Sequence, residues 1–214
     1  VQPVTFSYQY RLLEYHWSTI TQLMQYSVAQ ILSADNVYNY RIQNAIPTGF
    51  WTNMYYLAGN AEAMLDQAER ENNETAIAVA EIMKVMCMHV ITDAFGDVPY
   101  FEALKGYVSG GVSGFSPRYD KQKEIYRDMF LLLEDANTRL AQSGTDFDAA
   151  DDYMYGGNAL KWRKFGNSLY VRLLMRAAVK DEVDFESESL HAVSKLNEIF
   201  SYPSKYPVFE GRED

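Results

Sequence analysis

Apolar residues recur at a helical period along most of this chain and are interrupted by short polar breaks. Spacings of three and four residues between apolar positions are typical of amphipathic helices, whereas strict alternation would indicate strands. The pattern predicts helices at about residues 8–32, 48–71, 74–95, 121–142, 159–180 and 185–200. No block rich in strand signals appears, so we predict an all-α fold. Residues 1–7 and the proline-containing end, 201–214, are expected to be extended.

A strong helix stop lies in the stretch Ile91–Lys105. Gly96 follows the last periodic apolar residues, and we expect it to adopt the left-handed conformation that ends many helices. Pro99 then blocks continuation, because it lacks a backbone N–H group. Thr92 and Asp97 are expected to hydrogen-bond the free backbone groups at this end.

The helix at 74–95 is apolar on most sides, which predicts a central position in the fold. Asn73 is a good N-cap for it, and Asp120 is expected to cap the helix at 121–142 in the same way. Few residues separate the helix at 48–71 from the helix at 74–95, so these two are expected to form an antiparallel hairpin. We therefore predict antiparallel helix pairs with long loops, stacked like tetratricopeptide units but without a regular 34-residue sequence repeat.

Composition limits the class of protein. The 214 residues are 48% hydrophobic, enough for one domain with a real core, which we take to span 1–214. With 19 basic and 29 acidic residues the net charge is −10, which argues against nucleic acid or anionic lipid as the main partner. No run of eighteen apolar residues is present, so no membrane span is predicted. The single Cys87 lies in an apolar run and is interpreted as a core residue.

No catalytic constellation is apparent. The three histidines are far apart, no zinc-binding spacing occurs, and the aspartates between residues 146 and 152 lack the spacing of a calcium loop. Asp93, Asp97 and Glu102 are close in sequence, and paired carboxyls are what glycosidases use. Hydrogen bonding at a helix end explains these three residues more simply. We therefore expect neither an enzyme nor a metal or cofactor.

The loop at 33–47 combines aromatic, basic and amide side chains. Tyr38 and Tyr40 can stack on a sugar ring, while Arg41 can hydrogen-bond its hydroxyls. The same residues also suit a peptide-binding loop or an ordinary polar connector. Trp51, near the start of the next helix, fits either core packing or the wall of a pocket.

Four segments in order carry a family resemblance. The first is Thr92-Asp93-Ala94-Phe95-Gly96-Asp97-Val98-Pro99-Tyr100-Phe101-Glu102-Ala103-Leu104, and the second is Pro117-Arg118-Tyr119-Asp120-Lys121-Gln122 with Ile125-Tyr126. The third is Leu133-Glu134-Asp135-Ala136, and the fourth is Lys161-Trp162-Arg163-Lys164-Phe165-Gly166-Asn167-Ser168-Leu169 with Arg172 and Arg176. Together they resemble the SusD/RagB family of nutrient-binding outer-membrane lipoproteins. The resemblance covers at least residues 45–180 and looks like the amino-terminal, helical part of a family whose members are about twice this long.

The resemblance implies a tetratricopeptide-like α–α superhelix on the surface of a Bacteroidetes-type outer membrane. It also implies a lipid anchor on a cysteine outside this chain, and a role as a lid on a SusC-like TonB-dependent transporter. The cargo would be an oligosaccharide held by stacking and hydrogen bonds, with no covalent step. The ligand contacts expected from this chain are Tyr38, Tyr40, Arg41, Asn44 and Trp51. Two alternatives stay open: a peptide or other nutrient as cargo, and a helical-repeat scaffold that binds a protein partner.

Overall fold

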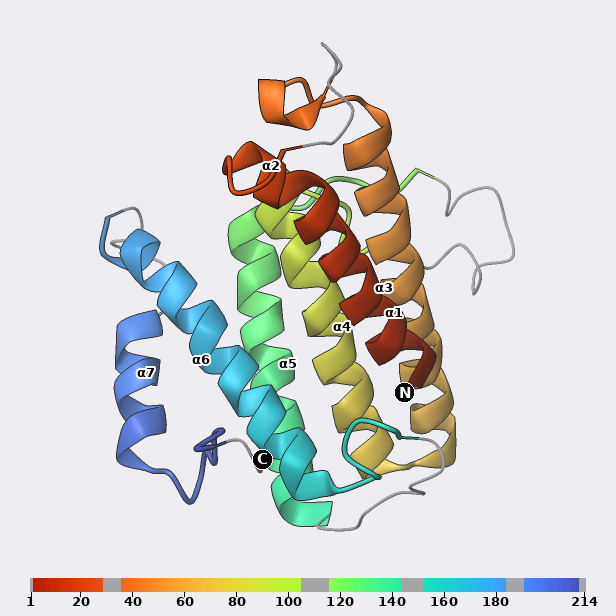
Figure 1. The fold of residues 1–214 in the computed structure, drawn as a ribbon. Coiled ribbons are helices and arrows are strands. Elements are labelled where there is room, and N and C mark those ends of the chain that lie inside the picture. The colour runs from red at the N-terminus through yellow and green to blue at the C-terminus, as the bar shows by residue number, and fades with distance from the viewer. Residues whose placement is uncertain (1, 29–35, 105–115, 144–151, 184–190, 212–214) are drawn as a thin grey trace.

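The structure, a computed structural model, describes residues 2–28, 36–104, 116–143, 152–183 and 191–211. Short elements open the chain, and long helices follow (Figure 1). The elements are α1 (Gln2–Tyr15), the π-helical turn η1 (His16–Ile20), α2 (Thr21–Leu23), the 3₁₀ turn η2 (Val37–Asn39), α3 (Ala45–Glu71), α4 (Glu74–Phe95), α5 (Gln122–Ser143), α6 (Ala159–Val183) and α7 (Ala192–Ser201). Between the expected helices, residues 33–35, 105–115 and 144–151 lie outside the described residues.

The helices from α3 to α7 run alternately up and down, and each packs against the next one in sequence (Figure 1). Helix α1 lies across the α3–α4 pair. Among the described residues the strand-like pairing is limited to one antiparallel bridge between Val98 and Asp120. The prediction of an all-α fold made of antiparallel helix pairs is therefore confirmed.

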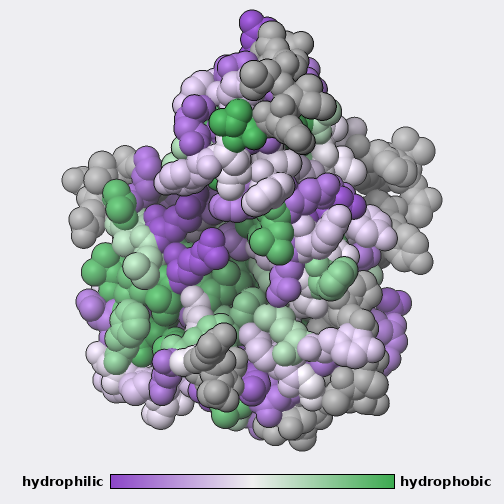
Figure 2. Space-filling model, in the orientation of Figure 1, coloured by the Kyte–Doolittle hydropathy of each residue, from purple (hydrophilic) through white to green (hydrophobic). Residues whose placement is uncertain are grey.

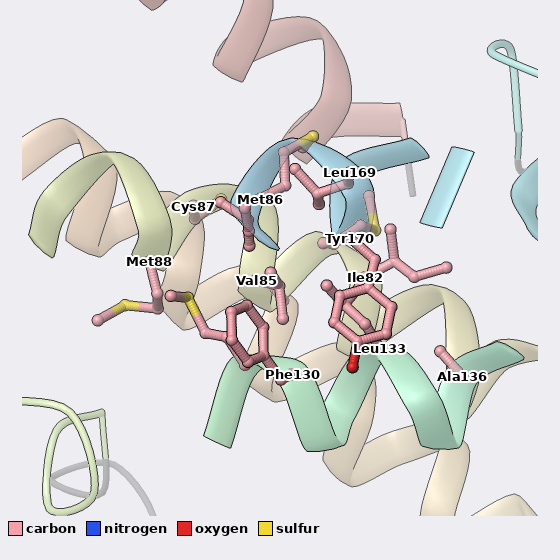
Figure 3. Close-up of a cluster of buried hydrophobic side chains, with 14 of the residues drawn as sticks. Ile82, Val85, Met86, Cys87, Met88, Phe130, Leu133, Ala136, Leu169 and Tyr170 are labelled. Atoms are coloured by element: carbon pink, nitrogen blue, oxygen red, sulfur yellow. The ribbon is translucent and has the colours of Figure 1, made fainter. Parts of the chain in front are cut away.

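Helix α4 is the centre of the core. Its side chains are buried on almost every side, between α3 and α1 on one flank and α5 and α6 on the other. Figure 3 shows Val85 of α4 between Phe130 and Leu133 of α5, and Met86 of α4 on the other side beside Leu169 of α6. Burial raises the pKa of the Cys87 thiol to about 12, as expected for an inert core cysteine. Helix α4 is long and apolar enough to cross a membrane by composition, but 83% of its apolar window is buried inside the protein, as in a core helix.

The hairpin between α3 and α4 follows from two asparagines. Asn72 adopts the left-handed conformation (φ 52°, ψ 39°), and its backbone N–H donates to the carbonyl groups of the last turn of α3. The Asn73 side chain then accepts a hydrogen bond of 3.0 Å from the backbone N–H of Ala76 at the start of α4. The predicted N-cap is thus confirmed, and so tight a connection leaves the two helices antiparallel.

The expectation for the start of the chain is wrong. Residues 2–7 are helical, because Val4 and Tyr8 are buried and continue the apolar face that packs on α3 and α4. Pro3 is tolerated there, since the first turn of a helix has no intrahelical acceptor for its N–H groups. The helix also ends earlier than expected, at Leu23 rather than Leu32: Gln25 takes a positive φ of 61°, and residues 29–32 lie outside the described residues.

The end of the chain also differs from expectation. Helix α7 begins at Ala192, and residues 185–190 lie outside the described residues. Residues 203–206 form a turn rather than an extended segment, which buries the Tyr206 ring. The Asn167 side chain of α6 then donates a hydrogen bond of 2.9 Å to the carbonyl oxygen of Pro207, so the tail is tied to the helices.

Candidate ligand-binding site

The loop at residues 96–104, here called the signature loop, follows α4 at one end of the helical array. Gly96 has φ +78° and ψ −122°, a conformation that L-residues with a side chain rarely adopt. The positive φ expected there is confirmed, but its ψ lies outside the left-handed helical region. The Thr92 hydroxyl donates a hydrogen bond of 2.7 Å to the carbonyl oxygen of Gly96, which fixes the turn.

Two aspartates, Asp97 and Asp120, hold the signature loop. Asp120 was expected from the sequence to bind the N–H groups at the start of α5, but Asp97 binds there. Asp97 accepts a hydrogen bond of 3.0 Å from the backbone N–H of Gln122, the first residue of α5, and its carboxylate also pairs with Lys121 at 2.7 Å. Asp97 therefore satisfies a free N–H group at the start of α5. Asp120, the expected N-cap of that helix, is buried and faces the signature loop instead.

The buried Asp120 carboxylate fixes the shape of the signature loop. One oxygen accepts hydrogen bonds from the backbone N–H groups of Tyr100 and Phe101, at 3.0 and 2.9 Å. The other oxygen accepts from the Arg118 guanidinium at 3.0 Å. The prediction that Asp120 caps α5 is wrong because its side chain has a stronger set of partners across the bridge to Val98.

Aromatic rings gather beside the signature loop, in what we call the aromatic cluster: Phe50, Trp51, Tyr55, Phe95 and Tyr119. Trp51 is at its centre, with Tyr55 at 4.7 Å, Phe95 at 5.0 Å and Tyr119 at 6.4 Å between ring centroids. The Trp51 and Tyr119 planes are only 29° apart, and 65% of Tyr119 is exposed. The Tyr55 hydroxyl donates to the carbonyl oxygen of Pro99 at 2.7 Å, which joins the cluster to the signature loop.

Two hollows lie on the α5 side of the signature loop, with Phe101 and Asp128 lining both. The larger, about 460 Å³, is an open groove whose walls include Arg118, Arg127 and Glu124. The smaller, about 270 Å³, includes the Lys84–Glu62 ion pair of 2.8 Å and Tyr100. Arg118, which lines the larger groove, is the residue before Tyr119 in the sequence. The charged groove therefore lies next to the exposed Tyr119 ring.

Four of the five expected ligand residues lie in the segment before α3. Tyr38 belongs to η2 and is half-buried, and its carbonyl oxygen accepts a hydrogen bond of 2.9 Å from the Gln25 side chain. Tyr40 has a positive φ of 58° and is largely exposed, as are Arg41 and Asn44. This combination of exposure and backbone constraint suits a binding loop. The assignment of these residues to a ligand stays a prediction.

The fifth residue, Trp51, is half-buried, and its ring contacts are with the aromatic cluster rather than with Tyr38 or Tyr40. Tyr119 was not among the expected residues, although it lies inside one of the family motifs. Exposed aromatic residues are common in this sequence, so only its position beside Trp51 singles it out. The sequence offered one indication of a binding role for Tyr119, which is that the charged residues Arg118 and Asp120 flank its aromatic ring.

The three carboxyls that were weighed as an acid/base pair have separate partners. Asp93 accepts from the Tyr126 hydroxyl at 2.6 Å and pairs with Arg176 at 2.9 Å. Asp97 pairs with α5, as described above, and Glu102 accepts from the backbone N–H of Arg118. Within the described ranges no group of three potential metal-ligating side chains occurs. The aspartates at 146–151 lie outside those ranges.

Comparison with known proteins decides the family. The sequence profile of a SusD-like family, described as starch-binding and associating with the outer membrane, matches residues 2–214. The chain belongs to the SusD-like family. No protein with a curated description matches it.

Solved structures agree with this SusD-like assignment. A chitin-binding protein is 30% identical with a TM-score of 0.65, over 83% of this chain and 36% of that one. A SusD homologue from Bacteroides uniformis is 27% identical with a TM-score of 0.62, over 78% and 32% of the two chains. A SusD/RagB family protein from Bacteroides thetaiotaomicron is 26% identical with a TM-score of 0.59, over 85% and 33%. The match thus spans about a third of each relative, and the stacked, tetratricopeptide-like helix pairs are confirmed.

Proposed function

We propose that this SusD-like chain is part of a surface protein that binds an oligosaccharide and delivers it to a TonB-dependent outer-membrane transporter. The aromatic cluster is the observation that carries the proposal. Trp51 and the exposed Tyr119 offer nearly parallel ring faces, and a sugar ring has an apolar face of matching width. Membership of a family described as starch-binding and associating with the outer membrane supports the same reading.

The groups around the cluster suit neutral sugars. Arg118 is held by Asp120 and Glu102, so its remaining N–H groups are oriented beside Tyr119. Tyr38, Tyr40, Arg41 and Asn44 would add contacts from the segment before α3. Stacking gives affinity without demanding one sugar, while placed hydrogen bonds give orientation, as in other small-molecule sites.

The first ligands to test are chito-oligosaccharides, because the relative at 30% identity is a chitin-binding protein, followed by oligosaccharides of starch. Calorimetry on the full-length protein would compare the unsubstituted chain with Tyr119→Ala and Trp51→Ala. We expect each substitution to weaken binding by about tenfold or more, as for an aromatic residue that is central to a contact. Tyr153→Ala is the matched control, since Tyr153 is at least as exposed as Tyr119 but lies before α6, outside the aromatic cluster.

Three outcomes would count against the proposal. Binding that resists both substitutions would place the site elsewhere. Binding of peptides instead of glycans would change the class of cargo. New reducing ends in the glycan after incubation would show catalysis rather than capture.

The role with a transporter needs its own test. We expect a complex with a TonB-dependent transporter to be recovered from the outer membranes of the source cells by affinity purification of the full-length protein. A full-length protein that binds glycan but never copurifies with such a transporter would overturn the transport role and leave glycan capture in place.

A further inference from the structure

A cleft lies between α1 and α6, with α4, on which both helices pack, at its floor. Its volume is about 260 Å³, and we call it the α1–α6 cleft. Figure 2 shows this face of the protein, with a green hollow near its centre and purple side chains along the rim. The α1–α6 cleft shares no lining residue with the aromatic cluster or with the two hollows beside the signature loop.

The wall formed by α6 carries polar and apolar groups on one helical face: Phe165, Ser168, Leu169 and Arg172. Their spacing of three and four residues places them side by side. Tyr8 of α1 lies in the opposite wall, and His89 of α4 lies in the floor. The tail closes one end, because the backbone N–H of Phe209 donates a hydrogen bond of 2.9 Å to the Ser168 hydroxyl.

His89 offers a hydrogen-bond acceptor to the cleft. Its side chain is only 2% exposed, and its Nδ1 atom lies 3.1 Å from the carbonyl oxygen of Val85. A carbonyl group only accepts, so Nδ1 carries the proton and donates it there. Burial lowers the pKa of His89, which keeps the ring neutral and leaves Nε2 as a bare acceptor. No described residue donates to Nε2, so this buried atom needs a partner that enters the cleft.

Two further polar groups of the cleft lack partners of their own. Burial raises the pKa of Tyr8, so its hydroxyl keeps its proton, and within the described ranges this hydroxyl makes no hydrogen bond. Arg172 lies close to both Tyr8 and His89, since its charge acts on the pKa of each. The exposed Arg172 guanidinium pairs with no carboxylate in the part of the chain that the structure describes. One cation and two neutral polar groups therefore converge on the same space.

These groups limit the chemistry of a ligand. A guanidinium group without an ion pair binds a carboxylate, often through two parallel hydrogen bonds. Nε2 of His89 requires an O–H or N–H donor. None of the residues that line the cleft is acidic, so an ammonium group would meet only the like charge of Arg172, and a hydroxyl is favoured.

The apolar part of the wall narrows the choice further. It consists of five large side chains, which are Leu12, Met86, Phe165, Leu169 and Phe209. A sugar acid would leave most of its hydroxyls without partners against such a wall, which is costly. An apolar body carrying a single hydroxyl avoids this cost.

We propose that the α1–α6 cleft binds a small hydroxy acid with an apolar body. Its carboxylate lies on Arg172 and accepts a hydrogen bond from the Tyr8 hydroxyl, while its own hydroxyl donates to Nε2 of His89. The apolar body packs against Phe165 and Leu169. A volume of about 260 Å³ is just below that of sites for drug-sized molecules, which restricts the ligand to a small one. The proposal is independent of the glycan site, because the two share no residue.

Calorimetry with phenyllactate on the full-length protein tests the proposal. We expect a dissociation constant on the order of 0.1 mM. Phenylpropionate lacks the hydroxyl, phenyllactamide lacks the charge, and phenylalanine has an ammonium group in place of the hydroxyl. Each of the three should bind about tenfold more weakly than phenyllactate, or worse.

Two substitutions locate the bound acid. Arg172→Gln should weaken phenyllactate binding by about tenfold or more. Lys180→Gln is its control, because it removes the same charge from α6 outside the cleft and should leave binding unchanged. Tyr8→Phe should weaken binding by about threefold to tenfold without loss of stability, because the hydroxyl that it removes has no partner among the described residues.

Four outcomes would overturn the proposal. The first is a folded full-length protein that does not bind phenyllactate, and the second is binding that survives both Arg172→Gln and Tyr8→Phe. Equal affinity for phenylpropionate would remove the role assigned to His89, and tighter binding of glucuronate than of phenyllactate would change the class of ligand.

Discussion

The carboxylate of Asp120 accepts a hydrogen bond of 3.0 Å from the backbone N–H of Tyr100, twenty residues earlier in the chain. The same oxygen binds Phe101, and the other oxygen binds Arg118. One buried side chain thereby joins two family motifs and positions Tyr119 beside Trp51. The proposed glycan platform therefore depends on a residue that itself touches no ligand.

Asp120→Asn should destabilise the protein. An amide offers one acceptor oxygen where the carboxylate offers two, so either the loop N–H groups or Arg118 would face a donor in a buried site. We expect the free energy of unfolding to fall by about 2 kcal/mol in urea titrations. Glu102→Gln is the control, because Glu102 is exposed and should cost much less. Equal losses in the two variants would show that burial of Asp120 is unimportant.

Glu81 makes stability depend on pH. Burial, with the nearby Asp135 carboxyl adding to it, raises the pKa of Glu81 to about 8, although Arg139 and Lys84 oppose the shift. Between its ordinary pKa of 4.5 and about 8, the unfolded chain releases a proton that the folded chain keeps. The free energy of unfolding should therefore fall as pH rises through this window, by on the order of a few kcal/mol.

Glu81→Gln tests this pH dependence, because a glutamine stays neutral and can still donate a hydrogen bond to Asp135. Urea titrations at several pH values from 5 to 8 should show the variant gaining stability over the unsubstituted chain as pH rises. Glu69→Gln, at an exposed position on α3, should show no such trend. A constant difference between Glu81→Gln and the unsubstituted chain would contradict the prediction.

Two helical glycines should respond to alanine in opposite ways. A Cβ atom at Gly166 of α6 would come within 2.8 Å of the Ile82 side chain, which is fully buried in α4, whereas one at Gly59 of α3 would meet only Leu104, at 3.7 Å. Gly59→Ala should stabilise by about 0.5–1 kcal/mol through helix propensity. Gly166→Ala should instead lose about 1–2 kcal/mol, because overpacking outweighs that gain. Thermal unfolding of both variants tests this prediction. A higher unfolding temperature for Gly166→Ala would contradict it, because it would show that the Ile82 side chain can move aside at little cost.

Asn167 should control the attachment of the carboxyl-terminal tail. Its buried side-chain amide donates to both Asn137 of α5 and the carbonyl oxygen of Pro207, each at 2.9 Å. We expect Asn167→Ala to speed amide hydrogen exchange at Tyr206, Val208 and Phe209 by about tenfold, since one lost hydrogen bond costs roughly 1–1.5 kcal/mol. Asn197→Ala, on the exposed side of α7, should leave that exchange unchanged. Unaltered exchange in Asn167→Ala would assign the attachment to Tyr206 and its partners instead.

The sequence by itself determined those elements whose signals are local. Helix α4 has the predicted bounds, because an unbroken apolar run lies between an asparagine cap and a glycine, and each of these acts on the backbone within a few residues. The antiparallel hairpin follows from the short connection at Asn72. The family motifs are equally legible in the sequence, and they agree with the profile match over residues 2–214.

Only the tertiary structure decided which residues act on each other at a distance. Asp120 looked like an N-cap, because a cap and a loop clamp have the same local sequence, and its partners Tyr100 and Phe101 arrive through the packing of α4 against α5. Residues 2–7 lacked a strong helix signal alone, yet burial of Val4 made them helical. In the same way, Tyr119 became a candidate ligand residue only when folding brought its ring next to Trp51. Local patterns encode backbone conformation, whereas such contacts depend on how whole helices pack.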